Sequence, residues 1–139
     1  AGVRVVSNGR LKAVSKIETQ PYSGFPTDMQ AQTVASLSTA AGTSVMVENL
    51  FENRFGYTKE LAKMGARISV KDRVAVVRGV KKLRGTSVEA KDLRGGAALI
   101  VAALGAEGES TVSGICHVDR GYYKFELDLA SLGADVRRI

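Results

Sequence analysis

Apolar residues recur with helical spacing in two long stretches of this chain and alternate with polar residues in two short ones. Residues 28–40 and 92–106 are Ala-rich and predict two helices. The second stretch is apolar on nearly every side, which is typical of a helix inside a core. Residues 44–49 and 110–115 carry β-branched side chains in alternation and predict two strands.

Shorter amphipathic stretches follow each predicted strand. Residues 57–64 and 121–132 predict second helices, which we expect to stop at Gly65 and Gly133. We expect two further glycines, at positions 42 and 108, to cap the C-terminal ends of the two Ala-rich helices.

Two hairpins are also predicted. Residues 67–70 and 74–78 are strand-like on either side of a short polar turn. Residues 3–6 and 11–14 flank Asn8-Gly9, a preferred sequence for a two-residue hairpin turn. The order of predicted elements is therefore β-α-β-α-β-β, preceded by a hairpin that resembles the end of an earlier unit.

The chain repeats itself. Gly42 matches Gly108 and Arg54 matches Arg120, and in each copy the Arg follows the Gly by twelve residues. An Asp leads each Ala-rich stretch, and the offset between the copies drifts from 64 to 68 residues. A duplication at this period indicates two supersecondary units that bury a shared face. We divide the chain into the end of a preceding unit (1–20), a first unit (21–85) and a second unit (86–139).

Composition narrows the function classes. The net charge of +6 indicates an anionic partner, but the aromatic content of 6% and the absence of long Lys/Arg runs argue against a nucleic-acid surface. No apolar run is long enough to predict a membrane span. A single Cys fits a reducing cytoplasm. The chain begins without Met in a strand-like stretch, so we expect it to be part of a longer protein.

Asp28 and Asp92 stand at the predicted starts of the Ala-rich helices. A carboxylate at this position can cap the first helical turn, and one that is held in place can also act as a general base toward a substrate hydroxyl. For Asp28, which follows Pro26 and Thr27, both roles stay open.

Arginines occupy the strand-to-helix junctions. Arg54 and Arg120 hold equivalent places in the repeat, and Arg94 follows Asp92. The planar guanidinium binds carboxylate and phosphate groups in a bidentate manner, so these side chains could converge on an anionic ligand. The structural alternative is that Arg54 and Arg120 cap helices or pair with acidic neighbours, namely Glu52 and Asp119.

Cys116 and His117 are weaker candidates. One Cys and one His cannot form a Cys/His metal site, so no metal site is predicted. We also expect no cofactor. Because Leu50 occupies the place of Cys116 in the first copy, we expect Cys116 to be a packing residue at the end of a strand and not a nucleophile.

Four blocks of sequence, in order along the whole chain, closely resemble the UDP-N-acetylglucosamine enolpyruvyl transferases. They are FPTDMQAQ at 25–32, FENRF at 51–55, DLR at 92–94 with its Ala-rich helix, and HVDRGY at 117–122. The enolpyruvylshikimate-phosphate synthases share the fold but carry different blocks. The resemblance implies an α+β fold, an inside-out α/β barrel built from β-α-β-α-β-β units, with the active site between two such domains. It identifies this chain with the C-terminal third of such an enzyme.

The resemblance also implies an activity: transfer of enolpyruvate from phosphoenolpyruvate to the 3′-hydroxyl of UDP-N-acetylglucosamine, the first committed step of peptidoglycan synthesis. Asp28 would be the base near the sugar hydroxyl, and Asp92 would share the proton chemistry. Leu50 and Phe51 would line the sugar-nucleotide pocket. The catalytic Arg120, with Arg54 and Arg94, would hold phosphoenolpyruvate and its tetrahedral adduct.

In this family the reactive Cys and a mobile loop lie in the other domain, so the chain alone is expected to lack catalysis and to need the rest of the parent enzyme as its partner. Two alternatives from other classes stay open. One is a non-catalytic anion-binding or assembly module of the same fold. The other is a basic nucleic-acid binder, which predicts steep salt dependence of binding.

Overall fold

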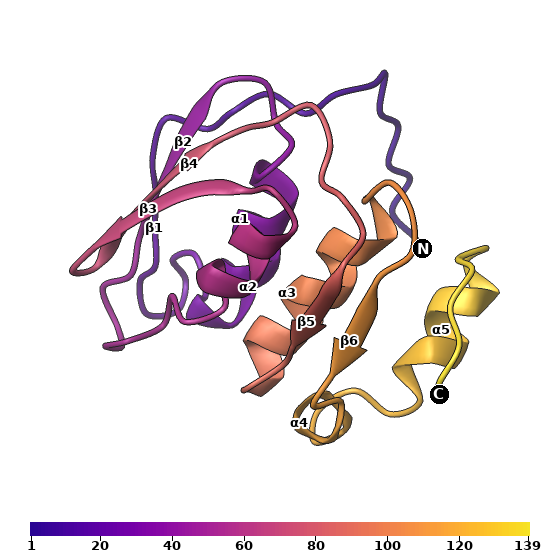
Figure 1. Cartoon of the computed structure of the whole chain (residues 1–139). Coiled ribbons are helices and arrows are strands. Elements are labelled where there is room, and N and C mark those ends of the chain that lie inside the picture. Colours follow the sequence, from indigo (N-terminus) through magenta and orange to yellow (C-terminus); the bar gives the residue numbers. More distant parts are fainter.

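The computed structural model describes all residues from 1 to 139 and contains a β-α-β unit twice (Figure 1). In the first of these, strands β1 and β2 are parallel and enclose helix α1, and β1 lies within residues 1–20, ahead of the predicted first unit. A second helix and an antiparallel hairpin follow. The elements are β1 (Ile17–Glu18), the 3-10 turn η1 (Thr27–Met29), α1 (Gln30–Leu37), β2 (Thr43–Val47), α2 (Thr58–Lys63), β3 (Arg67–Lys71) and β4 (Val74–Arg78).

The second unit begins in the same way. Strands β5 and β6 are parallel and enclose helix α3, which repeats the arrangement of β1, α1 and β2. Two helices complete the chain, and α5 lies beyond β6 at one end of the molecule (Figure 1). The elements are β5 (Ser87–Glu89), α3 (Leu93–Leu104), β6 (Thr111–Ser113), α4 (Cys116–Asp119) and α5 (Phe125–Ser131). The predicted repeat is therefore present in three dimensions, and the division into units by residue number stays a prediction.

The first sheet has the strand order β1-β2-β4-β3. The predicted hairpin is confirmed as β3 and β4, which pair antiparallel from Arg67 opposite Arg78 to Lys71 opposite Val74. β4 also pairs antiparallel with β2, so β2 lies between a parallel and an antiparallel neighbour. This position fixes the end of β2, from which residues 48–54 lead toward the site described below.

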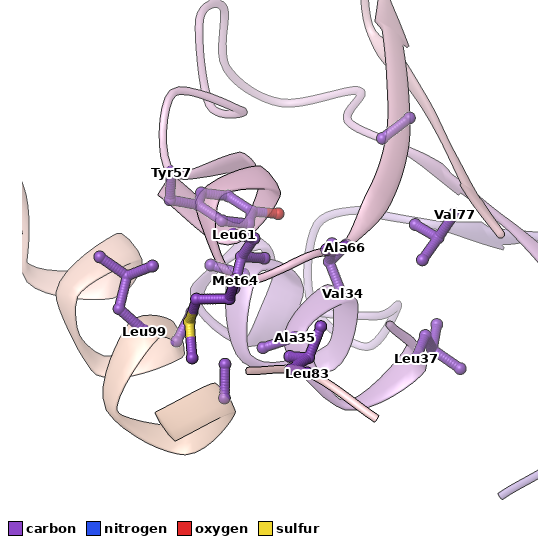
Figure 2. Close-up of a cluster of buried hydrophobic side chains, with 14 of the residues drawn as sticks. Val34, Ala35, Leu37, Tyr57, Leu61, Met64, Ala66, Val77, Leu83 and Leu99 are labelled. Carbon is purple, nitrogen blue, oxygen red and sulfur yellow. The ribbon is translucent and has the colours of Figure 1, made fainter. Parts of the chain in front are cut away.

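The core lies where α1, α2 and α3 meet the first sheet. Figure 2 draws part of it, with Val34 of α1, Leu61 of α2 and Leu99 of α3 in one buried cluster. Small residues let the helices approach closely: a Cβ added at Gly96 would lie 2.5 Å from a Val118 methyl carbon. The prediction that the second Ala-rich helix is buried is confirmed, because residues 95–100 of α3 are all buried.

The predicted hairpin at the N-terminus is wrong. Residues 11–14 instead run beside 41–45, where Ala41 N–H donates to the Leu11 carbonyl (2.7 Å) and Ala13 N–H donates to the Ala41 carbonyl (3.0 Å). The side chains of Val3 and Val5 are 93% and 85% exposed. An isolated two-stranded hairpin is marginal in water, so the backbone of 41–45 offers residues 11–14 better partners than the local turn does.

The glycines divide into two groups. Gly65 and Gly133 follow α2 and α5 with φ of 93° and 96°, so these predicted helix stops are confirmed. Gly42 and Gly108 also have positive φ but do not cap the Ala-rich helices, since α1 ends at Leu37 and α3 at Leu104. They lie in the turns that lead into the next strands, where the left-handed conformation reverses the chain.

None of the helices combines the length and apolar character that crossing a membrane requires.

Candidate functional site

Asp28 lies in the turn η1, at the entrance to α1. Pro26 precedes the turn with an extended backbone, and no side chain caps it. The capping role considered for Asp28 is therefore wrong. Its side chain is 67% exposed and is free to meet other elements.

The partner of Asp28 is Arg94, in the first turn of α3. Arg94 Nε donates to Asp28 Oδ1 at 2.5 Å, across 66 residues of sequence. Both side chains are more than one-third exposed, and exposed ion pairs contribute only about 0–1 kcal/mol to stability. The pair therefore does little for the free energy of folding. Its consequence is geometric: it orients the carboxylate and leaves Oδ2 without an ion-pair partner.

Asp92 has the capping role that Asp28 lacks. Its Oδ1 accepts a hydrogen bond from the Gly95 N–H at 2.7 Å, and its backbone is extended, as expected for a residue before a helix. The cap fixes the first turn of α3 and with it the backbone that carries Arg94. A Cβ added at Gly95 would lie 2.7 Å from Asp92 Oδ2, so this glycine leaves room for the carboxylate.

A narrow cleft of about 10 Å³ lies between η1, α1 and the start of α3. It brings together three of the predicted residues, Arg54, Asp92 and Arg94, beside the Asp28 pair. The lining residues are Thr27, Gln30, Ala31, Arg54, Tyr57, Asp92, Arg94 and Gly95. We refer to this space as the Asp28 cleft.

Arg54 reaches the Asp28 cleft from the segment after β2. Its guanidinium carbon lies 4.1 Å from the centre of the Phe51 ring, a cation–π contact that holds the side chain without an ion pair. The alternative pairing of Arg54 with Glu52 is wrong, because Glu52 pairs with Arg73 at 3.5 Å. Phe51 is 47% exposed and Leu50 is half-buried, so this segment forms an accessible wall.

Arg120 follows α4 and is exposed. Its alternative partner Asp119 instead binds Arg138, at 2.7 Å, so that pairing is also wrong. Gly121 places the backbone of this segment against the start of α3, since an added Cβ would lie 2.7 Å from a Leu93 methyl carbon. Arg120 therefore belongs to a segment that packs against Leu93 at the start of α3, and it does not line the cleft itself.

Glu48, the residue after β2, lies next to the cleft residue Thr27 and was not among the residues predicted from the sequence. Glu48 is 1% exposed, and its carboxylate accepts hydrogen bonds from Thr19, Thr27 and Gln30 side chains and from the Leu50 N–H. Burial alone would raise the pKa of Glu48, but the hydrogen bonds outweigh it and lower the pKa below its usual 4.5. The sequence signal that could have identified Glu48 is a charged residue directly after an apolar strand.

Tyr57 was also missed. It is buried, lines the Asp28 cleft and donates from its hydroxyl to Gln30 Oε1 at 2.6 Å. Burial, helped by the negative charges of Asp92 and Glu48, raises the pKa of Tyr57 well above 10. Tyr57 therefore stays a neutral hydrogen-bond donor that fixes the amide of Gln30.

Cys116 and His117 lie in α4, outside the cleft. Cys116 is exposed, so the prediction that it packs at a strand end is wrong. The structure contains no group of three or more His, Cys, Asp or Glu side chains arranged to hold a metal ion.

A larger hollow of about 980 Å³ lies between α3, β6, α4, α5 and residues 132–139. It contains none of the predicted site residues, and most of its lining is apolar. The charged side chains converge instead at the smaller Asp28 cleft.

The sequence profile of the EPSP synthase (3-phosphoshikimate 1-carboxyvinyltransferase) family matches residues 2–129. The chain belongs to this family. The family's fold is also found by structure: the enolpyruvyl transferase NikO from Streptomyces tendae has a TM-score of 0.79 and 36% identity over 91% of this chain and 30% of that one. An EPSP synthase from Acinetobacter baumannii shares the fold with a TM-score of 0.63 at 22% identity, over 81% of this chain and 26% of that one.

Two curated relatives match nearly the whole chain. A UDP-N-acetylglucosamine 1-carboxyvinyltransferase 2 from Caldanaerobacter subterraneus subsp. tengcongensis is 56% identical over 99% of this chain. A UDP-N-acetylglucosamine 1-carboxyvinyltransferase from Cereibacter sphaeroides (strain KD131) is 55% identical over 99% of it. In both cases the chain spans 33% of the relative's length. The resemblance drawn from the four sequence blocks and the expected enolpyruvyl transferase fold are both confirmed.

Proposed function

We propose that the protein containing this chain transfers enolpyruvate from phosphoenolpyruvate to the 3′-hydroxyl of UDP-N-acetylglucosamine and releases phosphate. The observation that carries this proposal is the Asp28–Arg94 pair beside a cleft that Arg94 lines together with Arg54 and Asp92, in a chain whose relatives include enzymes of that name. The reaction would serve peptidoglycan synthesis in the cytoplasm, and through it cell-wall biogenesis, cell shape and division.

Asp28 is the proposed base. Arg94 holds one carboxylate oxygen, so the second oxygen can accept the proton of an incoming sugar hydroxyl. Asp92 would share this proton chemistry through Oδ2, because its Oδ1 is engaged in the helix cap. Both carboxylates are held by neighbouring groups, which lowers the cost of orienting them during the reaction.

The arginines are the proposed anion-binding groups. Phosphoenolpyruvate carries a carboxylate and a phosphate, and the departing phosphate needs fixed positive charge. Arg94 and Arg54 line the cleft, and Arg120 belongs to the segment that packs against Leu93 at the start of α3. Leu50 and Phe51 form the accessible wall that we assign to the sugar nucleotide.

The test uses the full-length parent protein, since the chain covers a third of its relatives' length. Phosphate release from phosphoenolpyruvate is measured with UDP-N-acetylglucosamine and, separately, with 3-phosphoshikimate, the acceptor in the name of the matching family. We expect release only with the sugar nucleotide. Phosphate release only with 3-phosphoshikimate would show that the proposed acceptor is wrong. No phosphate release with either acceptor would favour a non-catalytic module.

A further inference from the structure

Glu48 is a buried carboxylate without a cationic partner. Its Oε1 accepts from Thr27 Oγ1 at 2.5 Å and from Gln30 Nε2 at 3.3 Å, and its Oε2 accepts from Thr19 Oγ1 at 2.6 Å and from the Leu50 N–H at 3.1 Å. A buried charge is costly unless hydrogen bonds replace its hydration. These four bonds supply that replacement, and Glu48 has no part in the proposed proton transfer or anion binding.

The four donors come from different parts of the chain. Thr19 follows β1, Thr27 and Gln30 belong to η1 and the start of α1, and Leu50 lies in the segment after β2. Two of them are next to site residues: Thr27 precedes Asp28 and lines the Asp28 cleft, and Leu50 precedes Phe51. Glu48 therefore joins the turn that carries the base to the wall assigned to the sugar nucleotide.

The carboxylate also decides how Thr27 presents its hydroxyl. A carboxylate can only accept, so Thr27 must point its proton inward to Glu48 Oε1. The hydroxyl oxygen of Thr27 therefore presents its lone pairs to the cleft, where it can accept a hydrogen bond. Gln30 is oriented in the same way, because Tyr57 donates to its oxygen and leaves its NH₂ group for Glu48.

We propose that Glu48 is a positioning residue for the acceptor substrate: it holds Thr27 as a hydrogen-bond acceptor beside Asp28 and fixes the Leu50–Phe51 wall. This inference rests on the proposed function. It assigns no proton transfer to Glu48, and its effect is on how the sugar nucleotide is bound.

Glutamine has the same shape as glutamate but cannot reproduce these bonds. An NH₂ group in place of Oε2 would face the Leu50 N–H, which can only donate. In place of Oε1 it would face Gln30 Nε2 and would force the Thr27 hydroxyl to accept, turning its proton toward the cleft. Glu48→Gln therefore either turns the Thr27 hydroxyl from a hydrogen-bond acceptor into a donor toward the cleft, or displaces the Leu50 segment.

The experiment compares Glu48→Gln with Glu60→Gln in the full-length parent. Glu60 is a matched control: it is 7% exposed, and it accepts from the Glu89 N–H at 2.9 Å and from Lys63 Nζ at 2.8 Å, outside the cleft. We measure kcat, the KM for each substrate and the melting temperature. For Glu48→Gln we expect the KM for UDP-N-acetylglucosamine to rise about tenfold, the loss of one good hydrogen bond, with the KM for phosphoenolpyruvate within about twofold.

Glu60→Gln should lower the melting temperature and leave both KM values unchanged. If Glu48→Gln behaves like this control, Glu48 is only structural and the inference is overturned. If Glu48→Gln does not fold, the same measurements are made on Thr27→Val. This change removes the oriented hydroxyl but keeps the shape of the side chain. An unchanged KM for UDP-N-acetylglucosamine in Thr27→Val would then overturn the inference. An inactive wild-type parent would instead overturn the proposed function, so the two failures are distinguishable.

Discussion

Replacing Asp28 by Asn in the full-length parent separates its catalytic role from its structural one. The amide oxygen of Asn can still accept from Arg94 Nε, so the geometry of the pair is retained. The change removes the negative charge and the basic oxygen. Because Asp28 is 67% exposed and its ion pair is an exposed one, unfolding should become easier by at most about 1 kcal/mol.

The expected effect on turnover is much larger. Loss of general-base assistance costs about 10²- to 10⁴-fold in rate, which corresponds to about 2.7–5.4 kcal/mol in the activation barrier. The expected loss in the activation barrier is larger than the expected loss of stability, so a change in stability cannot account for the loss of turnover. Phosphate release gives kcat, and urea unfolding gives the free energy of unfolding for the same preparation.

A matched control is available in Glu107→Gln. Glu107 pairs with Lys82 at 2.8 Å, both side chains are about as exposed as Asp28, and neither lines the cleft. We expect this control to keep wild-type turnover. If Asp28→Asn also kept it, Asp28 would not be the base, and the assignment of the cleft would lose its main support.

Further predictions concern three other residues of the parent. Arg120→Lys should weaken phosphoenolpyruvate binding more than UDP-N-acetylglucosamine binding, since a point charge cannot form a bidentate grip; equal losses in calorimetric titrations would indicate a structural role. Cys116→Ser should leave both activity and sensitivity to thiol-alkylating inhibitors unchanged, because Cys116 is exposed and outside the cleft; loss of that sensitivity would contradict the assignment. The stability that Glu48 contributes should be fully present above about pH 4.5 and lost as pH falls through its lower folded pKa, so urea unfolding should show the gap between wild type and Glu48→Gln narrowing in acid; a constant gap would argue against a buried anion.

The sequence predicted the elements whose signals are local. The buried helix α3 follows from an apolar run that has no polar face, and the ends of α2 and α5 follow from Gly65 and Gly133. The hairpin of β3 and β4 has a short turn and strand-like residues on either side. In each case neighbouring residues determine the conformation, so the pattern is sufficient.

The features that sequence missed depend on distant parts of the chain. The Asn8-Gly9 turn signal was overridden because 41–45 offered backbone partners to residues 11–14. Asp28 pairs with Arg94 across 66 residues, and Glu48 meets Thr19 across 29. Such contacts are set by how α1, α3 and the first sheet pack, which local periodicity does not contain.

The central claim is that the acceptor sugar binds beside the Asp28 cleft, with its 3′-hydroxyl next to the proposed base. A crystal structure of the full-length parent with UDP-N-acetylglucosamine tests it most directly, through the distance from the 3′-hydroxyl oxygen to the Asp28 carboxylate. We predict about 2.6–3.2 Å to the oxygen that Arg94 does not bind. A sugar bound with its 3′-hydroxyl beyond reach of Asp28, directly or through one water, would contradict the account.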